Sequence, residues 1–266
     1  MLKLENIYFS YDKGKEVLKN ISIDIEKGKK IIFLGENGSG KSTLFFLLNG
    51  ILKKDSGDIF LENKKKKNMK KDLDELRRKV GVVFQDPDIQ IFAPTVFQEI
   101  AYGLENIGFS INEIESKVEK ILKELELNDL KENPCHHLSY GQKKRVSIAS
   151  IVAMNPEVLV LDEPTAWLDP KNIKKITDIL EDLNKKGKTI IISTHDIDFA
   201  YDIADYIYIL HNGIILKKGS RDEIFEDFEF FKKLNFNIPN KLKIKKFLNK
   251  KEINIEEYDK FLKENF

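Results

Sequence analysis

The sequence of 266 residues has one cysteine, almost no net charge and no long apolar run. A single cysteine excludes a disulfide scaffold and any zinc or iron–sulfur site made from several cysteines of this chain. The longest uncharged stretch is eleven residues, well short of the roughly 18–20 that cross a bilayer. Lys and Arg total 45 against 44 Asp and Glu, so the net charge gives no overall attraction to nucleic acid or to anionic lipid. With charges early and no apolar core, the first residues do not resemble a signal peptide. We expect a soluble globular protein of a reducing compartment.

Short apolar runs that alternate with segments of helical periodicity predict an α/β fold. Period-2 patterning predicts half-buried strands at 1–9 and 21–25. Further strands are predicted at 30–34, 80–84, 158–161, 189–193, 206–210 and 214–217, the last two joined by a hairpin at Asn212-Gly213. Helices are predicted at 42–52, from 112, from 141 to about 154, at 173–183 and at 197–204. This alternation is typical of a mostly parallel sheet covered on both faces.

Two local interpretations concern polar residues outside the predicted strands. Charge dominates between Glu62 and Lys79, including the run Lys64–Lys67, and favours a solvated loop that leads into a short polar helix. A contact with nucleic acid or lipid headgroups is the alternative for this run. Asn112, with Glu115 three residues later, predicts a capping pair at the start of an amphipathic helix.

A glycine-rich loop follows the strand predicted at 30–34 and matches the phosphate-binding pattern G-x-x-x-x-G-K-[ST]. Its residues and the next one are Gly35, Glu36, Asn37, Gly38, Ser39, Gly40, Lys41, Ser42 and Thr43. Glycines let backbone N–H groups turn inward around phosphate oxygens, and the N-terminus of the following helix adds partial positive charge. Lys41 can reach the β- and γ-phosphates, and Ser42 offers a hydroxyl to Mg²⁺. We therefore expect nucleotide binding.

Two acids end the apolar strand predicted at 158–161. Asp162 and Glu163 would lie at the carboxyl end of a buried parallel strand, where α/β sheets bind ligands. Asp162 can hold Mg²⁺ directly or through water, and Glu163 can accept a proton from an attacking water or orient it. A strand followed by an acidic turn is the plain alternative, and it loses weight beside the phosphate loop. Ser139, ahead of a predicted helix, can meet an anion at the helix N-terminus or act as an ordinary cap.

These motifs, in this order, resemble those of ATP-binding-cassette (ABC) ATPases, the nucleotide-binding subunits of ABC transporters. The resemblance covers about residues 1–220 and includes the phosphate loop, Gln85, the Leu138–Gln142 signature, Asp162-Glu163, Ala166–Asp169 and His195. It implies an α/β fold with a mixed RecA-like core sheet, an N-terminal antiparallel β-subdomain and a helical signature subdomain at about 96–155. The expected division is an ABC ATPase domain at 1–220 and a C-terminal helical extension at 221–266.

The resemblance implies ATP and Mg²⁺ as ligands, with ATP hydrolysis as the activity. The expected catalytic residues are Glu163, His195, Gln85 and Lys41, and the expected Mg²⁺ ligands are Ser42, Gln85 and Asp162. Tyr11 would stack on adenine, although an isolated tyrosine is more often plain packing.

Part of the site would come from a second subunit. Ser139 and Gly141, with Gln142 beside them, would bind the γ-phosphate of ATP held by another copy or a paralogue in a head-to-tail dimer. Two aromatic residues depart from the family pattern, since Tyr140 and Trp167 each stand where a glycine is common. We expect Trp167 to pack at the dimer interface.

The segment Gln85–Gly103 is similar to that of the cobalt/nickel and energy-coupling-factor importers, although Ile89 replaces a residue that is usually acidic or an amide. In that group the segment forms a short helix that lines the groove for the transmembrane subunits. The resemblance thus implies integral membrane partners, a peripheral place on the cytoplasmic face of the cell membrane, and uptake of a transition-metal cation, cobalt before nickel. Vitamin uptake through an energy-coupling factor, or another importer, is the alternative.

A soluble ABC ATPase that acts on nucleic acid or ribosomes belongs to a different class. Such proteins usually carry tandem cassettes or long coiled-coil insertions, and the sequence shows neither. We expect no nucleic-acid partner. A catalytically inactive regulatory cassette is disfavoured because Lys41, Glu163 and His195 are all present.

Overall fold

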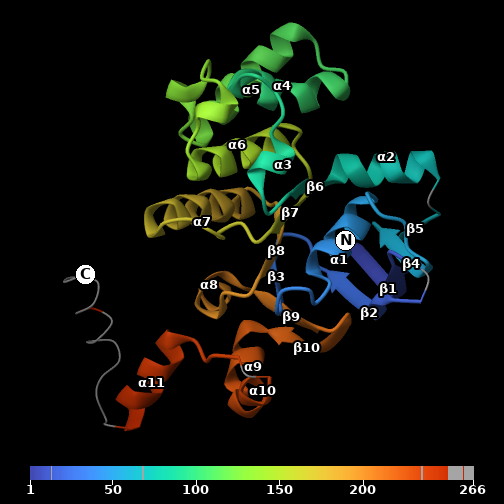
Figure 1. The fold of residues 1–266 in the computed structure, drawn as a ribbon, viewed down its shortest axis with the longest axis vertical. Coiled ribbons are helices and arrows are strands. Elements are labelled where there is room, and N and C mark those ends of the chain that lie inside the picture. Colours follow the sequence, from blue (N-terminus) through green and yellow to red (C-terminus); the bar gives the residue numbers. More distant parts are fainter. Residues whose placement is uncertain (13, 68, 235, 251–259, 261–266) are drawn as a thin grey trace.

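Two β-sheets organise the chain, and helices surround the larger one (Figure 1). The structure is a computed structural model that describes residues 1–12, 14–67, 69–234, 236–250 and 260. Among these residues, no helix is both long enough and apolar enough to cross a lipid bilayer.

The smaller sheet is antiparallel, with the strand order β2-β1-β4-β5. Its strands are β1 (Leu2–Ser10), β2 (Glu16–Ile25), β4 (Ser56–Leu61) and β5 (Lys64–Lys66). The prediction of a loop at Lys64–Lys67 is wrong, because Lys64–Lys66 form a strand that pairs with β4 across a tight turn. Lysines suit an edge strand, and Lys66 alone turns inward, where its Nζ contacts Glu75 Oε2 at 2.7 Å.

The larger sheet has the order β10-β9-β3-β8-β7-β6, and only the edge strand β10 runs antiparallel. Its strands are β3 (Lys30–Leu34), β6 (Val80–Val83), β7 (Val158–Asp162), β8 (Thr189–Thr194), β9 (Tyr206–His211) and β10 (Ile214–Ser220). The predicted mostly parallel sheet and the closing hairpin are confirmed. In the hairpin turn Asn212 and Gly213 both have positive φ, 47° and 79°, as an Asn-Gly turn requires.

Helices cover both faces of this sheet and gather at its two ends (Figure 1). They are α1 (Lys41–Asn49), α2 (Lys70–Lys79), α3 (Pro87–Gln90), α4 (Val96–Asn106), α5 (Ile111–Glu124), α6 (Tyr140–Ala153), α7 (Pro170–Lys185), α8 (Ile197–Ile203), α9 (Arg221–Glu226), α10 (Phe228–Lys233) and α11 (Asn240–Lys250). Helices α4, α5 and α6 lie beyond the β6 edge, whereas α9–α11 lie at the opposite end of the molecule.

The capping pair of α5 lies two residues before the predicted one. Ser110, not Asn112, precedes the helix, and Glu113 Oε2 accepts hydrogen bonds from both the Ser110 N–H (2.9 Å) and its hydroxyl (2.6 Å). Both pairs have the capping-box spacing. Ile111, three residues before Ile114, fits the apolar spacing of the helix but is 76% exposed, so the buried stripe begins only at Ile114.

The C-terminal helices pack against the main core. Ile224, Phe225 and Phe231 are buried in the same hydrophobic cluster as the faces of β3 and β8 that α7 and α8 cover. Helix α11 is tied to α8 by polar contacts, among them Lys241 Nζ to Asp202 Oδ1 at 2.6 Å. Residues 251–259 and 261–266 of the expected extension lie outside the described residues.

Candidate active site

The phosphate loop connects β3 to α1 in the order that the sequence predicts. Gly38 and Gly40 have φ of +79° and +107°, a left-handed conformation that side-chain-bearing residues rarely adopt. A Cβ at Gly40 would also lie 2.8 Å from Leu18 Cδ2 on β2. The two glycines thus let the loop turn tightly and bring its backbone N–H groups to the start of α1.

A cavity of about 370 Å³ lies against this loop. Its lining is Val17, Asn37, Gly38, Gly40, Lys41, Ser42, Thr43, Gln85, Asp162 and Glu163. Residues from the loop, from the end of β6 and from the end of β7 therefore meet as predicted, because parallel strands place their carboxyl ends at one edge of the sheet. Sequence reasoning missed Val17, whose contribution depends on how the antiparallel sheet packs beside the loop.

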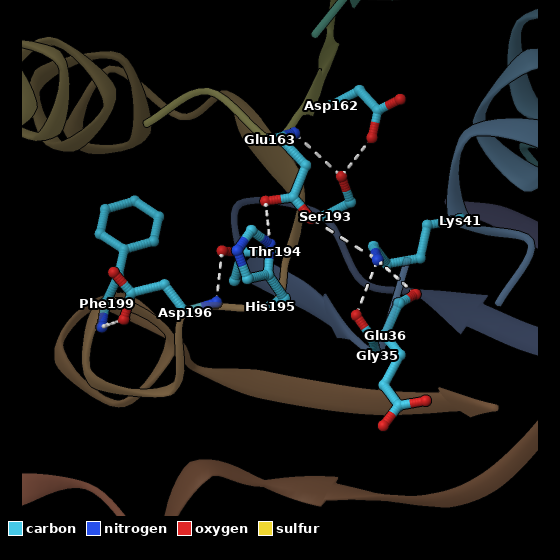
Figure 2. A network of polar contacts seen from close by, with 10 residues as sticks. All are labelled: Gly35, Glu36, Lys41, Asp162, Glu163, Ser193, Thr194, His195, Asp196 and Phe199. Carbon is cyan, nitrogen blue, oxygen red and sulfur yellow. Dashed lines mark hydrogen bonds and ion pairs between the residues drawn. The ribbon is translucent and has the colours of Figure 1, made fainter. Parts of the chain in front are cut away.

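Lys41 is the buried cation of the cavity, with a side chain that is only 6% exposed. Its Nζ donates to the carbonyl oxygens of Gly35 (2.7 Å) and Glu36 (3.0 Å), as Figure 2 shows. Gly35 and Glu36 therefore hold the lysine and do not line the cavity, and Ser39 is buried next to them. A lysine fixed in this way presents its charge to an anion in the cavity.

Glu163 lies opposite Lys41, buried at the end of β7 (Figure 2). Its Oε2 is 3.0 Å from His195 Nδ1, and its Oε1 is 3.5 Å from Lys41 Nζ without a hydrogen-bond partner among the described residues. The backbone has φ of +43°, and the Glu163 N–H donates to the Ser193 carbonyl and hydroxyl oxygens. Glu163 therefore lines the cavity in a rigid, strained setting, with its buried Oε1 facing Lys41.

The expected Mg²⁺ ligands share the cavity. Ser42, Gln85 and Asp162 all line it, and they offer hydroxyl, amide and carboxylate oxygens, the hard donors that Mg²⁺ prefers. Asp162 is held from behind by the Ser193 hydroxyl, which donates to its Oδ1. Few protein donors are needed, because Mg²⁺ in nucleotide sites takes its other ligands from phosphate and water. The residues present therefore fit the metal.

Two predicted residues lie outside the cavity lining but next to it. The Tyr11 hydroxyl is 3.1 Å from the Thr43 hydroxyl, and Tyr11 is 58% exposed while Phe9 packs edge-on against it. An exposed aromatic ring beside the phosphate loop is able to stack on a base. The His195 side chain is 58% exposed, and its Nδ1 contacts Glu163.

The signature residues are not brought to the cavity of their own chain. Ser139 caps α6 and exchanges hydrogen bonds with Gln142, whose side-chain oxygen accepts from the Ser139 N–H at 2.8 Å. A Cβ at Gly141 would lie within 2.8 Å of the Asn172 side chain, so this glycine lets α6 pack closely against the start of α7. A role for these residues in nucleotide binding requires a second subunit.

The two aromatic residues that depart from the family pattern contact each other. Their rings meet edge to face, with Tyr140 and Trp167 centroids 5.8 Å apart. Trp167 is 70% exposed and has φ of +61°, a conformation for which glycine is better suited. The Tyr140 hydroxyl donates to the Gln85 carbonyl at 3.3 Å, and burial, with Asp86 and Asp88 nearby, raises the pKa of Tyr140 to about 12.

Sequence reasoning also gave no role to Lys144 and Arg145, two buried cations of α6. Lys144 Nζ donates to the carbonyls of Phe84 (2.9 Å) and Gln85 (2.6 Å), and burial lowers its pKa to about 8. Arg145 donates to the Leu125 and Glu126 carbonyls. The available signal was helical spacing, because Lys144 lies one turn after Tyr140 on the same face of α6.

A second, larger cavity opens where the helices α2, α4 and α6 approach β6. This groove of about 870 Å³ is largely apolar, and Phe84, Tyr102, Gly103, Ile107, Ile151 and Met154 are among its lining residues. Of the segment predicted to line a groove, Gln85–Gly103, only Tyr102 and Gly103 do so. The predicted short helix of that segment is present as α3, on which Ile89 is 74% exposed.

Known proteins with the same sequence pattern and fold are ABC cassettes. The sequence model described as ABC transporter matches residues 18–166, and the chain belongs to this family. The energy-coupling factor transporter ATP-binding protein EcfA of Methanocaldococcus jannaschii is 48% identical over 95% of this chain and 90% of its own. EcfA of Methanococcus maripaludis is 44% identical over 95% and 91%.

Solved structures agree with the sequence comparison. CbiO1 of Clostridium perfringens, part of the ABC transporter complex cbiONQ, has a TM-score of 0.78 and 41% identity over 88% of this chain and 94% of its own. The cassette MJ0796, in a dimeric post-hydrolysis state bound to ADP and Pi, has a TM-score of 0.76 and 31% identity over 83% and 99%. The fold class expected from sequence is confirmed. The chain is an ABC ATPase that binds ATP with Mg²⁺, in a transporter of the energy-coupling-factor type.

Proposed function

We propose that this chain hydrolyses ATP at the phosphate-loop cavity to power an importer for a transition-metal cation, cobalt before nickel. The observation that supports the site most directly is the facing pair of buried side chains, Lys41 and Glu163, in a cavity lined by phosphate-loop residues. A fixed cation and a carboxylate beside it are what phosphoryl transfer to water needs from a protein.

Each residue of the cavity has a distinct task in this proposal. Glu163 accepts the proton of the attacking water, and His195 Nδ1 holds its Oε2. Lys41 stabilises negative charge on the phosphates. Ser42, Gln85 and Asp162 would hold Mg²⁺, which when bound neutralises phosphate charge. His195 orients Glu163 and contacts the γ-phosphate, and Tyr11 stacks on adenine.

A second subunit would complete the site. Ser139, Gly141 and Gln142 lie at the exposed N-terminus of α6, where a helix end favours an anion from outside the chain. The dimeric state of MJ0796 supports this assembly. Whether the partner is another copy or a paralogue is an outcome of coexpression, since either would supply the same motif.

The groove between α2, α4 and α6 is the proposed docking place for integral membrane subunits. Its lining is largely apolar, with Asp74, Arg77 and Arg78 among the polar residues, and Tyr102, Ile107 and Ile51 are each more than a third exposed. Exposed apolar patches of this kind mark interaction sites. CbiO1 is part of a transporter complex, which supports the same assembly for this chain. The subunit would then lie at the periphery of the cell membrane, on its cytoplasmic face. The segment Gln85–Gly103 contributes Tyr102 and Gly103 to this face.

The sequence resemblance supports two cargoes. The similarity of Gln85–Gly103 to the cobalt/nickel and energy-coupling-factor importers favours cobalt, with nickel next, and leaves vitamin uptake as the alternative. CbiO1 of the cbiONQ complex and the EcfA proteins are both among the similar proteins. The decisive experiment expresses this chain with the membrane subunits encoded beside it and measures uptake of labelled Co²⁺, Ni²⁺ and a panel of vitamins. We expect Co²⁺ uptake that a Glu163→Gln chain abolishes. Vitamin uptake alone would overturn the metal assignment, and recovery with ribosomes or DNA in place of membrane proteins would overturn the transporter assignment.

A further inference from the structure

One face of α6 binds the main chain just before and at Gln85. Tyr140, Lys144 and Ser147 are spaced along a single side of the helix, at intervals of four and three residues. Tyr140 and Lys144 donate to the Gln85 carbonyl at 3.3 and 2.6 Å, and Lys144 also donates to the Phe84 carbonyl at 2.9 Å. The Phe84–Gln85 backbone is therefore fixed to the helix that carries the signature at its N-terminus.

The side chain of Gln90 also links the Phe84 backbone to α6. Its side-chain oxygen accepts from the Phe84 N–H at 2.9 Å, and its amide nitrogen donates to the Ser147 carbonyl at 2.9 Å. Both polar groups of Phe84 and the carbonyl of Gln85 are thus bound by side chains that belong to, or are attached to, α6. A backbone held at three points has little freedom to shift along the cavity.

Lys144 is the strongest of these contacts. Its side chain is fully buried, so its ammonium group has lost its hydration. The hydrogen bonds to two carbonyls offset the free-energy cost of that desolvation. No carboxylate contacts it within ion-pair distance among the described residues. A buried lysine bound to main-chain carbonyls acts on the position of that main chain.

We propose that Lys144 is a positioning residue for ATP hydrolysis: through the Phe84 and Gln85 carbonyls it sets the Gln85 side chain in the cavity in register with the signature end of α6. Gln85 lines the phosphate-loop cavity and Phe84 lines the groove, so the fixed peptide joins both sites. This inference rests on the role proposed above for Gln85. It adds that Lys144 of α6 positions Gln85.

The test replaces Lys144 by Met, which keeps the length and removes the donor, in the full-length chain. We expect kcat to fall about 10- to 100-fold, since small misplacement of a catalytic group costs that much, while KM for ATP stays within about twofold. Lys144→Gln, which keeps an amide donor, should recover most of the rate. Lys143→Met is the matched control, because Lys143 pairs with Asp88 at the surface and does not bind the Phe84–Gln85 backbone. Its kcat should be unchanged.

A double-mutant cycle separates positioning from general destabilisation. Gln85→Ala alone should lower kcat, and adding Lys144→Met should then cause no further loss. Losses that multiply would overturn the positioning role while leaving the role of Gln85 intact. An unchanged kcat in Gln85→Ala would instead refute the proposed role of Gln85, and the inference with it. If Lys144→Met does not fold, the cycle is run with Tyr140→Phe, which removes only the second donor and should show a smaller loss that also disappears without Gln85.

Discussion

The phosphate-loop cavity and the apolar groove differ in how the chain builds them, although they meet at adjacent residues. The lining of the cavity comes mainly from one continuous loop and two strand ends, and it includes the charged side chains of Lys41, Asp162 and Glu163. The groove collects apolar side chains from β6 and from helices far apart in sequence. Phe84 faces the groove and its neighbour Gln85 faces the cavity. A binding site for a small anion can be built from a few short stretches of sequence, whereas a surface that binds another protein combines segments that lie far apart in the sequence.

The largest expected effect separates chemistry from binding within the cavity. Glu163→Gln removes the carboxylate that accepts the proton, so kcat should fall by about 10² to 10⁴, while ATP affinity is retained. The variant should also accumulate as an ATP-bound dimer. Steady-state hydrolysis, calorimetric titration with ATP and size-exclusion chromatography measure the three quantities. Glu115→Gln, an exposed position on α5, is the control, and hydrolysis at the normal rate in Glu163→Gln would show that another group is the base.

Lys41→Ala tests the binding side of the same cavity. Removal of a buried cation that faces the phosphates should weaken ATP binding about 10- to 100-fold, the worth of a hydrogen bond to a charged group. Equilibrium titration with a fluorescent ATP analogue measures the change, with exposed Lys53→Ala as the comparison. Unaltered affinity would contradict the assignment of the phosphate loop.

A substitution in the groove should weaken binding to the membrane subunits and leave ATP binding unchanged. Tyr102→Ser removes an exposed ring that packs edge-on against Phe92, with centroids 4.6 Å apart. We expect recovery with coexpressed membrane subunits to fall about tenfold, as for an aromatic anchor at an interface, while ATP affinity stays unchanged. Ile111→Ser removes a side chain that is 76% exposed and does not line the groove, so it should copurify normally. Equal losses in both variants would argue against docking at the groove.

The smallest expected effect concerns Cys135, which is buried in the main hydrophobic cluster between α5 and α6. Cys135 is 4% exposed, and burial raises the pKa of its thiol from 9.0 to about 11. At pH 8 only about a thousandth of the folded thiol is ionised, so iodoacetamide should label it slowly until the chain unfolds. Because the unfolded thiol ionises first, the stability that this group contributes should fall as pH rises from about 9 to about 11. Rapid labelling of the folded protein would show that the core around Cys135 opens readily.

The same contrast explains how far the sequence could be interpreted. Strand ends, the phosphate loop and Asp162-Glu163 could be predicted because each is a local pattern whose neighbours along the chain define it. The contacts of Lys144 could not, because its partners are main-chain carbonyls about sixty residues earlier, and carbonyls carry no signature in the sequence. Lys64–Lys66 form a strand through pairing with β4, and their own composition favoured a loop. The groove was predicted only at Tyr102 and Gly103, since its other walls come from separate segments.

The contact between Tyr140 and Trp167 gives the protein a built-in optical probe. Trp167 is the only tryptophan of the chain, and most of its surface meets solvent. Its emission therefore comes from a single point, where the start of α6 meets the segment after β7. Any ligand or subunit that covers this point removes water from the indole and moves the emission to shorter wavelength, so assembly can be followed in the unlabelled protein.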